Sequence, residues 1–298
     1  MRKNRLKIVF CIFVVVLFAL PTYISNSRAD VVQVDTRGIG HFLPMENCSL
    51  IMTNASVIFN IEHKTSRIDV EFEGNYTIYN PDESTNVTLA APFSTNFYNL
   101  ESTSIVKIGG NITPFSIVEI EIDEFPWSQY LESSHERYYS RKLIVINTTI
   151  PENSSIELEY FFEAYTADPN SVDGIEIYYD VGTSRVWNGS ITESVEFRVH
   201  GKLPDSYSHT YSNYPGDVID YNCTVTNIEN GKSYLWEWLN EVITADAVFI
   251  EYSNPWRYIW ARIVPFIIVP LVLLPLIIPI IIIRRRAKRR KAVDQLEV

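Results

Sequence analysis

Carboxylates are abundant among the side chains in this sequence that could carry out chemistry. Glu119, Glu121 and Asp123 alternate along one apolar segment, and acids so placed could bind Ca²⁺ or act as glycosidase acids. The same alternation is typical of the solvated face of a β-strand, and we favour that interpretation. A carboxylate-dependent surface hydrolase stays an alternative, and we assign no residue a catalytic role.

Other catalytic and ligand-binding patterns do not occur in the sequence. There is no Gly-X-Ser-X-Gly elbow for a nucleophile, and none of the 11 glycines builds a phosphate-binding loop. The histidines lack the paired spacing of a zinc site. We expect all five at the surface or at strand edges: His41, His63, His135, His200 and His209. The sequence therefore predicts no metal and no cofactor.

Tyrosines suggest a binding site instead. Tyr207, Tyr211, Tyr214 and Tyr221 flank the Pro215-Gly216 turn in a polar segment. Exposed tyrosine rings stack on sugars or anchor a protein partner. The interpretation that we favour is that these rings close one end of a β-sandwich, and the binding site is the alternative. The partner expected from this segment is a protein or a glycan outside the cell.

The cysteines indicate the compartment. Cys11 lies in an N-terminal segment that we expect to be cleaved, which leaves Cys48 and Cys223 in the mature chain. Two cysteines in an oxidising compartment favour one disulfide bond, and two buried thiols are the alternative.

Nine Asn-X-Ser/Thr triplets lie between the two terminal apolar segments. Such triplets accept N-linked glycans on exposed surface, so we predict a glycoprotein. Asn75 lies inside an expected strand, and it is the position most expected to stay unmodified. The nine asparagines are Asn47, Asn54, Asn75, Asn86, Asn111, Asn147, Asn153, Asn188 and Asn222.

Strands are the elements that must position all these residues. Apolar and polar residues alternate along Ser56–Glu62, Arg67–Glu73 and Ser155–Glu163, which is typical of strands with one buried face. Turn residues at Asn80-Pro81-Asp82, Gly109-Gly110 and Asn230-Gly231 separate such segments. We expect about a dozen strands, more than the seven to nine of one immunoglobulin-like unit. The prediction is an all-β ectodomain of two packed antiparallel β-sandwich-like units, residues 30–167 and 168–255.

The two ends of the 298-residue chain predict its topology. Residues 1–29 resemble a signal peptide, with basic residues before the apolar run Ile8–Leu20. We expect cleavage after Ala29, and an uncleaved anchor is the alternative. Residues 256–283 comprise a juxtamembrane aromatic belt and one C-terminal transmembrane helix. Its 21-residue apolar segment, Ile263–Ile283, would be about 31 Å long as a helix. Residues 284–298 form a basic tail that the positive-inside rule places in the cytoplasm.

The charge is distributed in agreement with this topology. The net charge is −11, made up of +5 in residues 1–29, −21 in residues 30–283 and +5 in the tail. The acidic middle part argues against nucleic-acid binding, whereas the tail should attract anionic lipid of the inner leaflet.

Four prolines within the apolar segment indicate a kinked or partnered helix. A tolerated anchor is the simpler interpretation. A helix that docks into a membrane transport or secretion complex, as an accessory subunit, is the alternative.

Part of the chain resembles secreted prokaryotic β-domains of unknown function. The resemblance rests on Asn75-Tyr-Thr-Ile-Tyr-Asn80 followed by Leu89-Ala-Ala-Pro-Phe93, and on Ile175–Ser190 and Tyr234–Tyr252. It implies an all-β, extracytoplasmic fold and no particular activity. We therefore expect a glycosylated type I protein of the cell membrane. Its N-terminal domain should be extracellular and act in binding, in adhesion or in a surface assembly.

Overall fold

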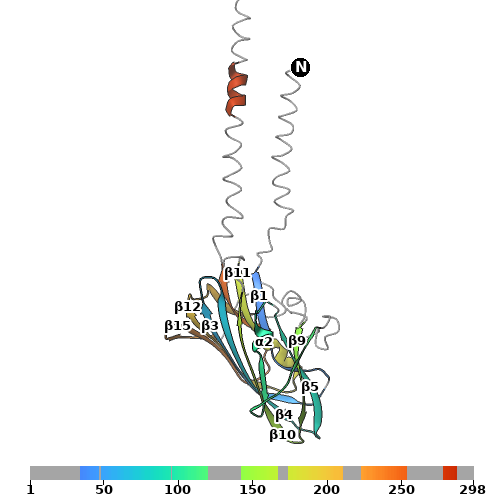
Figure 1. Ribbon diagram of the computed structural model, residues 1–298. Coiled ribbons are helices and arrows are strands. Elements are labelled where there is room, and N and C mark those ends of the chain that lie inside the picture. Colours follow the sequence, from blue (N-terminus) through green and yellow to red (C-terminus); the bar gives the residue numbers. More distant parts are fainter. Residues whose placement is uncertain are drawn as a thin grey trace, which may run out of the picture. The chain divides into compact units, whose positions relative to one another are not determined.

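The described residues of the computed structural model are 34–46, 48–94, 96–119, 142–166, 174–210, 223–253 and 278–286. The chain divides into two compact units, Met1–Ser253 and Asn254–Val298. Within the first unit, sixteen described strands form two sheets (Figure 1). Within the second, residues 278–286 are helical. No helix in the described ranges is both long and apolar enough to cross a membrane.

Sheet A contains eight strands in the order β13-β16-β11-β1-β5-β9-β8, with β2 paired to β5. Their bounds are β1 (Val34–Gly40), β2 (Leu43–Pro44), β5 (Thr85–Phe93), β8 (Ser116–Glu119), β9 (Lys142–Ile150), β11 (Gly174–Asp180), β13 (Ser206–Thr210) and β16 (Ala247–Ser253). The 3-10 helix η3 (Val181–Val186) follows β11 directly.

Sheet B contains eight strands in the order β14-β15-β12-β3-β4-β10-β6-β7. Their bounds are β3 (Ile51–His63), β4 (Ile68–Asn80), β6 (Ile105–Ile108), β7 (Asn111–Ile112), β10 (Ser154–Tyr165), β12 (Ile191–Gly201), β14 (Thr224–Ile228) and β15 (Gly231–Glu241). The short helix α2 (Leu100–Thr103) packs against β10.

The pairing differs from two separate antiparallel sandwiches. In sheet A, β1 pairs in parallel with β11, and in sheet B, β3 pairs in parallel with β12. Strands from residues 30–167 and from residues 168–255 therefore share both sheets, and both sheets are mixed. The all-β prediction is confirmed. The antiparallel arrangement is wrong, because alternation identifies a strand but not its neighbour.

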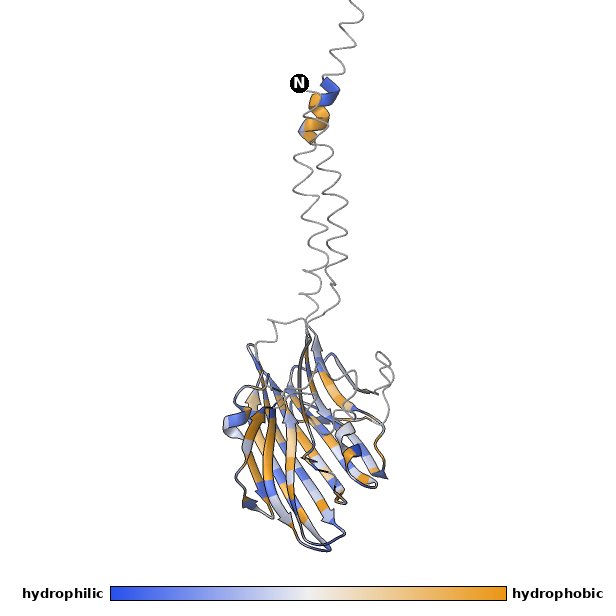
Figure 2. Ribbon diagram, turned by 90° about the vertical axis from the view of Figure 1, so that its right-hand side faces the viewer, coloured by the Kyte–Doolittle hydropathy of each residue, from blue (hydrophilic) through white to orange (hydrophobic). Residues whose placement is uncertain are grey.

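Period-two burial creates the apolar core. Along β3, Val57, Phe59 and Ile61 are buried while the residues between them remain accessible. Figure 2 shows hydrophobic and hydrophilic residues following one another along the strands. Phe59 stacks on Phe197 of β12 within sheet B, with ring centroids 4.6 Å apart, and contacts Tyr179 of sheet A at 6.2 Å. The aromatic core therefore joins the inner faces of the two sheets.

Turn residues end several strands where the sequence indicates. The buried Asn80 side chain donates from Nδ2 to the carbonyl of Ile150 at 3.1 Å and accepts from the amide of Asp82 at 3.1 Å. Gly109 and Gly110 have φ values of 56° and 77° between β6 and β7. Asn230, with φ 58°, closes the β14–β15 hairpin. The predicted turns at these positions are confirmed.

Candidate functional site

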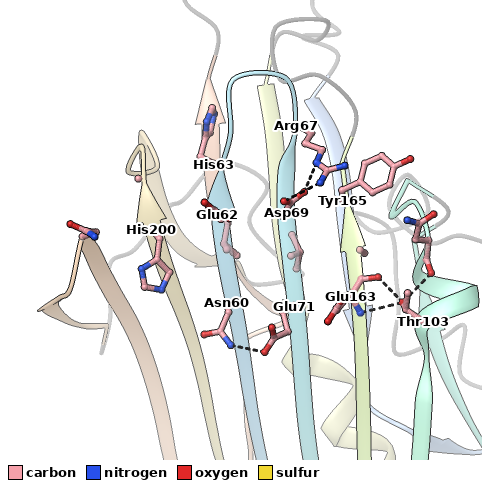
Figure 3. A pocket seen from close by; sticks show the side chains of 16 residues that line it. Asn60, Glu62, His63, Arg67, Asp69, Glu71, Thr103, Glu163, Tyr165 and His200 are labelled. Carbon is pink, nitrogen blue, oxygen red and sulfur yellow. Dashed lines mark hydrogen bonds and ion pairs between the residues drawn. The ribbon is translucent and has the colours of Figure 1, made fainter.

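A polar groove of about 760 Å³ lies on the outer face of sheet B, at the end where β3 meets β4 (Figure 3). Its floor consists of outward-facing side chains of three adjacent strands. It is lined by Asn60, Ile61, Glu62, His63, Arg67, Asp69, Val70, Glu71, Asn99, Thr103, Glu163, Ala164, Tyr165, His200, Gly201 and Asn230.

Strand register brings the floor residues together. Glu71 of β4 lies opposite Asn60 of β3 on one side and opposite Glu163 of β10 on the other. The amide Nδ2 of Asn60 donates to Oε1 of Glu71 at 3.2 Å. One row further, Asp69 lies between Glu62 and Tyr165. The groove thus presents two rows of polar side chains across three strands.

Basic side chains neutralise only one of these rows. Lys64 Nζ pairs with Glu62 Oε2 at 3.0 Å and also with Asp69. Arg67 Nε lies 2.7 Å from Asp69 Oδ1. Among the described residues, no cation lies within ion-pair distance of Glu71 or Glu163. Because no cation neutralises them, these two carboxylates are available to hydrogen-bond a ligand. Their like charges lie opposite each other on neighbouring strands, which is unfavourable without a ligand.

One wall of the groove is held rigidly against β10. The amide of Tyr98 donates to the carbonyl of Tyr165 at 2.9 Å, and the amide of Tyr165 donates back at 3.1 Å. Their rings stack with centroids 5.3 Å apart, and Arg67 lies 5.0 Å from the Tyr165 centroid. Thr103 Oγ1 donates to the carbonyl of Glu163 at 2.6 Å. The segment around α2 is therefore anchored at two points.

Two histidines line the groove near its β3 and β12 edge. His200 Nδ1 lies 3.1 Å from the Glu229 carbonyl oxygen. The ring of His63 lies 5.1 Å from that of Tyr252. Burial, together with the positive charge of Lys202, lowers the pKa of His63. His63 is therefore neutral at pH 7 and can both donate and accept hydrogen bonds.

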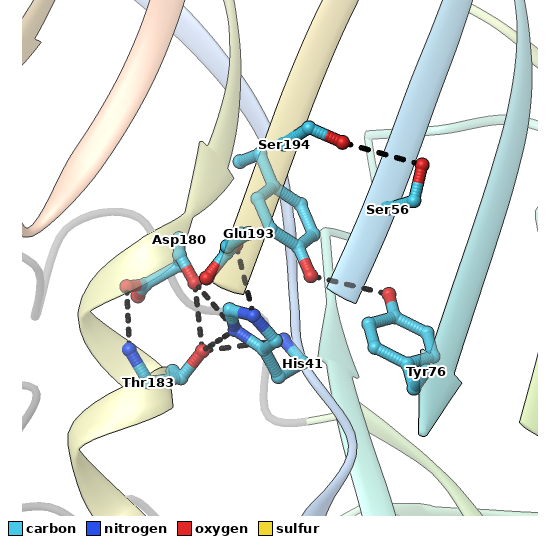
Figure 4. Close-up of polar contacts among 8 residues, drawn as sticks. His41, Ser56, Tyr76, Asp180, Thr183, Glu193 and Ser194 are labelled. Carbon is cyan, nitrogen blue, oxygen red and sulfur yellow. Dashed lines mark hydrogen bonds and ion pairs between the residues drawn. The ribbon is translucent and has the colours of Figure 1, made fainter. Parts of the chain in front are cut away.

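A second polar cluster lies inside the molecule, between the sheets (Figure 4). His41 Nε2 lies 3.0 Å from Glu193 Oε1, and neither side chain is exposed at all. His41 Nδ1 lies 2.7 Å from Thr183 Oγ1, which itself donates to the Asp180 carbonyl. This histidine, carboxylate and hydroxyl resemble a nucleophile triad in composition. Since they are fully buried, we assign them a structural role.

His41 corrects a prediction from the sequence. All five histidines were expected at the surface or at strand edges, but His41 is fully buried. It follows β1 of sheet A, and Glu193 belongs to β12 of sheet B, 152 positions later. No local pattern in the sequence links two residues so far apart.

The predicted tyrosine site is only partly within the described ranges. Tyr207 is half-buried on β13, where its ring packs against Tyr234 at 4.7 Å and Trp236 at 6.5 Å. Tyr211, Tyr214 and Tyr221 lie outside the described residues. The tyrosine that lines the groove is Tyr165, and the ring of Tyr98, which does not line the groove, stacks on it.

The acidic candidates do not line the groove. Glu119 is exposed at the end of β8, opposite Lys142 of sheet A, and Glu121 and Asp123 lie outside the described residues. Within the described ranges, no three His, Cys, Asp or Glu side chains come together as potential metal ligands.

No disulfide joins Cys48 to Cys223 in the described part of the chain. The carbonyl of Cys48 accepts from Asn188, just before β12 begins at Ile191. Cys223 precedes Thr224, which pairs with Leu235 of β15, and Leu235 pairs with Glu196 of β12. Cys48 thus lies beyond the Ile191 end of β12, whereas Cys223 lies near the level of Glu196. Ile191 and Glu196 are five residues apart, about 16 Å along the strand, whereas a disulfide requires Cα atoms within about 7 Å. The predicted bond is therefore wrong.

Seven of the nine predicted glycan acceptors lie in the described ranges. Asn75 is half-buried. The other six are exposed, namely Asn54, Asn86, Asn111, Asn147, Asn153 and Asn188. Asn47 and Asn222 lie outside those ranges. Asn86 and Asn147 line a smaller hollow of about 240 Å³ on β5 and β9. There Thr149 Oγ1 donates to Asn86 Oδ1 at 2.6 Å, and Thr88 Oγ1 donates to Asn147 Oδ1 at 2.7 Å.

The groove could not have been identified from sequence spacing. Its residues come from segments around positions 60–71, 99–103, 163–165, 200 and 230, which only strand pairing brings together. The alternation of each strand did indicate that these side chains are accessible.

No protein-family model matches this chain, and no curated protein matches it. Among solved structures, a Legionella pneumophila protein described as a "putative nutrient binding protein" is 12% identical, with a TM-score of 0.50. The match covers 74% of this chain and 72% of that one. At this identity the match shows a shared fold alone. No characterised family is found, in agreement with the resemblance to β-domains of unknown function.

Two hydrolases also match at lower similarity. Yeast LTA4 hydrolase is 10% identical with a TM-score of 0.35, over 68% of this chain and 29% of that one. Legionella pneumophila aminopeptidase A, in complex with aspartic acid, is 9% identical with a TM-score of 0.36, over 70% and 22%. This chain spans less than a third of either enzyme, and neither match supports an argument about activity.

Proposed function

We propose that this chain is a membrane-anchored, glycosylated surface protein that binds a ligand in the groove of sheet B. The observation that carries the proposal is the groove itself, a preformed polar site of about 760 Å³ whose walls are fixed by backbone hydrogen bonds. Ligand sites are typically preformed hollows with a few convergent polar groups. The solved structure with a TM-score of 0.50 bears a description as a nutrient binding protein, which agrees with a binding role.

The positions of the glycan acceptors support this site. Asn54 and Asn75 share the outer face of sheet B with the groove, but neither lines it. Along β4, Asn75 lies four residues from Glu71, about 13 Å away, and along β3, Asn54 lies six residues from Asn60, about 20 Å away. Sugars attached at these asparagines would cover the opposite end of the face and leave the groove open.

The proposed anchor is the apolar segment Ile263–Ile283, with residues 1–29 as a cleaved signal. The basic tail 284–298 would stay in the cytoplasm, where each positive charge near anionic lipid contributes about 1 kcal/mol of membrane attraction. The groove would then face the exterior, together with the acidic part of the chain.

Protease treatment of intact cells tests the orientation. We expect trypsin to digest residues 30–255 and to spare an epitope tag placed after Val298. Digestion of the tag with the β-domain left intact would overturn the proposed topology.

A ligand screen tests the site. The full-length chain in detergent is heated with panels of sugars, amino acids, peptides and polyamines, and thermal shifts identify ligands. We expect a shift that is lost in the Glu71→Gln/Glu163→Gln variant and kept in Glu73→Gln/Glu157→Gln, which changes two exposed acids on the same face outside the groove. An equal shift in both variants would contradict the proposed site.

A further inference from the structure

We propose that one end of the β-domain lies on the outer surface of the bilayer, where Lys64, Arg67 and Lys202 contact zwitterionic lipid headgroups. The inference rests on the proposed membrane anchor and adds which part of the domain meets the lipid. We call this part the exit end, and it comprises the β3–β4 turn (residues 64–67), residues 201–205 and Ser253. Three observations carry the inference: the place where the chain leaves the domain, the short link to the aromatic belt, and the distribution of the glycan acceptors.

Contacts around Ser253 show that both sheets share the exit end. The amide of Ser253 donates to Asp205 Oδ2 at 2.7 Å. The ring of Tyr252 lies 5.1 Å from that of His63, and Lys202 Nζ lies 5.9 Å from the Tyr252 centroid. The last residues of β16 in sheet A therefore lie beside the ends of β3 and β12 in sheet B.

The link from this end to the predicted aromatic belt is short. Only Asn254 and Pro255 separate Ser253 from Trp256, the first residue of the belt. Three residue steps span at most about 11 Å. Tryptophan and tyrosine rings of such belts lie at the level of the lipid headgroups. With the belt in that layer, the exit end is held close to the headgroups.

The glycan acceptors lie away from the exit end. Asn54 is near the start of β3, and Asn75 lies beyond the midpoint of β4, counted from the β3–β4 turn. Asn153 directly precedes Ser154, which pairs with Asn80 at the last position of β4. A glycan is bulky and solvated, so an end without acceptors agrees with contact to lipid. All seven acceptors in the described ranges lie in the opposite half of the domain: Asn54, Asn75, Asn86, Asn111, Asn147, Asn153 and Asn188.

The exit end presents charges of both signs. Its three cationic side chains are between 43% and 50% exposed. Ammonium and guanidinium groups bind phosphate, and carboxylates beside them attract the ammonium group of a zwitterionic headgroup. Such a surface fits zwitterionic lipid better than strongly anionic lipid. The pairs are Lys64 with Glu62, Arg67 with Asp69, and Lys202 with Asp205.

This placement bears on the proposed ligand site. The groove is lined in part by His63, Arg67 and Gly201, which lie at the exit end. Its ligand would therefore be bound beside the headgroups, whereas the glycans would project from the other end of the domain.

Fluorescent labels at the two ends of β4 test the inference. The full-length chain with Cys48→Ser/Cys223→Ser is placed in phosphatidylcholine nanodiscs that contain a lipid with a nitroxide quencher on its headgroup. Ser66→Cys puts the label in the exposed β3–β4 turn, and Ser84→Cys puts it in the exposed turn after β4. We expect at least twofold quenching at position 66 and none at position 84, since the 13 residues of β4 span about 43 Å.

Charge reversal tests the headgroup contact itself. Lys202→Glu should reduce the quenching at position 66, because a carboxylate repels lipid phosphate. Lys107→Glu is the matched control, since it also reverses one half-exposed cation of an ion pair, with Glu159, but on β6 outside the exit end. It should leave the quenching unchanged. Equal quenching in the two variants would overturn the proposed contact.

A third label separates failure of this inference from failure of the proposed anchor. If a label at Asn254→Cys is quenched and the label at position 66 is not, the inference is overturned and the anchor is retained. If neither label is quenched, both proposals are overturned. Equal quenching at positions 66 and 84 would place the long side of the domain along the bilayer and also overturn the inference.

Discussion

At the scale of single residues, the buried pair of His41 and Glu193 is the most demanding feature of the molecule. Removing two ionisable groups from water costs desolvation free energy. This cost is offset only when the two groups lie close together and their remaining polar atoms are hydrogen-bonded. Thr183 Oγ1 gives its proton to the Asp180 carbonyl, so it accepts the Nδ1 proton of His41. The remaining ring nitrogen faces Glu193. The pair therefore links sheet A to sheet B in one defined geometry.

Removing either partner should destabilise the fold. We expect His41→Ala or Glu193→Ala to lower the free energy of unfolding by about 3–5 kcal/mol, because each leaves a buried polar group alone. His41→Leu/Glu193→Leu should recover part of that loss. Urea denaturation, monitored by tryptophan fluorescence, measures the free energy of unfolding of each variant. Arg198→Ala, which breaks the half-exposed Arg198–Glu196 pair on β12, is the control and should cost less than about 1 kcal/mol.

Two other acids make stability depend on pH. Burial, and then the carboxylate of Glu251 on the neighbouring strand, raises the pKa of Glu176 to about 7. Burial also raises the pKa of Asp180 to about 7. Between the ordinary carboxyl pKa and 7, the folded chain therefore holds protons that the unfolded chain has released. Stability should fall as the pH rises through this window.

Glu176→Gln should remove one contribution to that pH dependence. We expect the variant to be more stable than the unmodified chain at pH 8, by on the order of 2 kcal/mol, and equally stable at pH 4. Urea denaturation across this pH range measures the difference. A constant difference at all pH values would show that packing, rather than ionisation, distinguishes the two side chains. Glu157→Gln, at an exposed position, should leave the profile unchanged.

At the scale of elements, the β14–β15 hairpin shows how closely two backbones approach. A Cβ atom at Gly231 would lie 1.8 Å from the carbonyl oxygen of Val199 on β12. Glycine is therefore required at this first position of β15 for the hairpin to pair with β12. Sequence patterning indicated the turn at Asn230-Gly231 but not the second strand that Gly231 meets.

Gly231→Ala should separate the hairpin from β12. We expect a loss of about 2 kcal/mol or more in the free energy of unfolding, since a rigid backbone contact must give way. Hydrogen exchange should show lost protection in β14 and β15 and retained protection in β4 and β10. Lys232→Ala, at the next position, should alter neither quantity. Uniform loss across sheet B would contradict a local effect.

At the scale of the whole molecule, the two parts of the β-domain depend on each other. Residues before 168 supply β1 and β3, and residues after 168 supply their parallel partners β11 and β12. Cutting the chain there would leave each of these four inner strands with one unpaired edge, which favours aggregation.

Neither part should fold alone. We expect residues 30–167 and residues 168–255, expressed separately, to lack a cooperative thermal transition by circular dichroism. Residues 30–255 should show one. Independent cooperative unfolding of either part would contradict mutual dependence of the two parts and would support the predicted domain boundary.

The sequence alone determined the strands and several turns. Alternation along β3 and β4, and the turns at Asn80 and Asn230, depend on neighbours within a few residues, where side-chain chemistry dominates. Strand partners were decided only in three dimensions. The parallel pairs β1–β11 and β3–β12 join residues well over a hundred positions apart, and register decides which side chains meet. The groove, the burial of His41 and the separation of Cys48 from Cys223 all follow from that pairing, because each depends on contacts that no local pattern encodes.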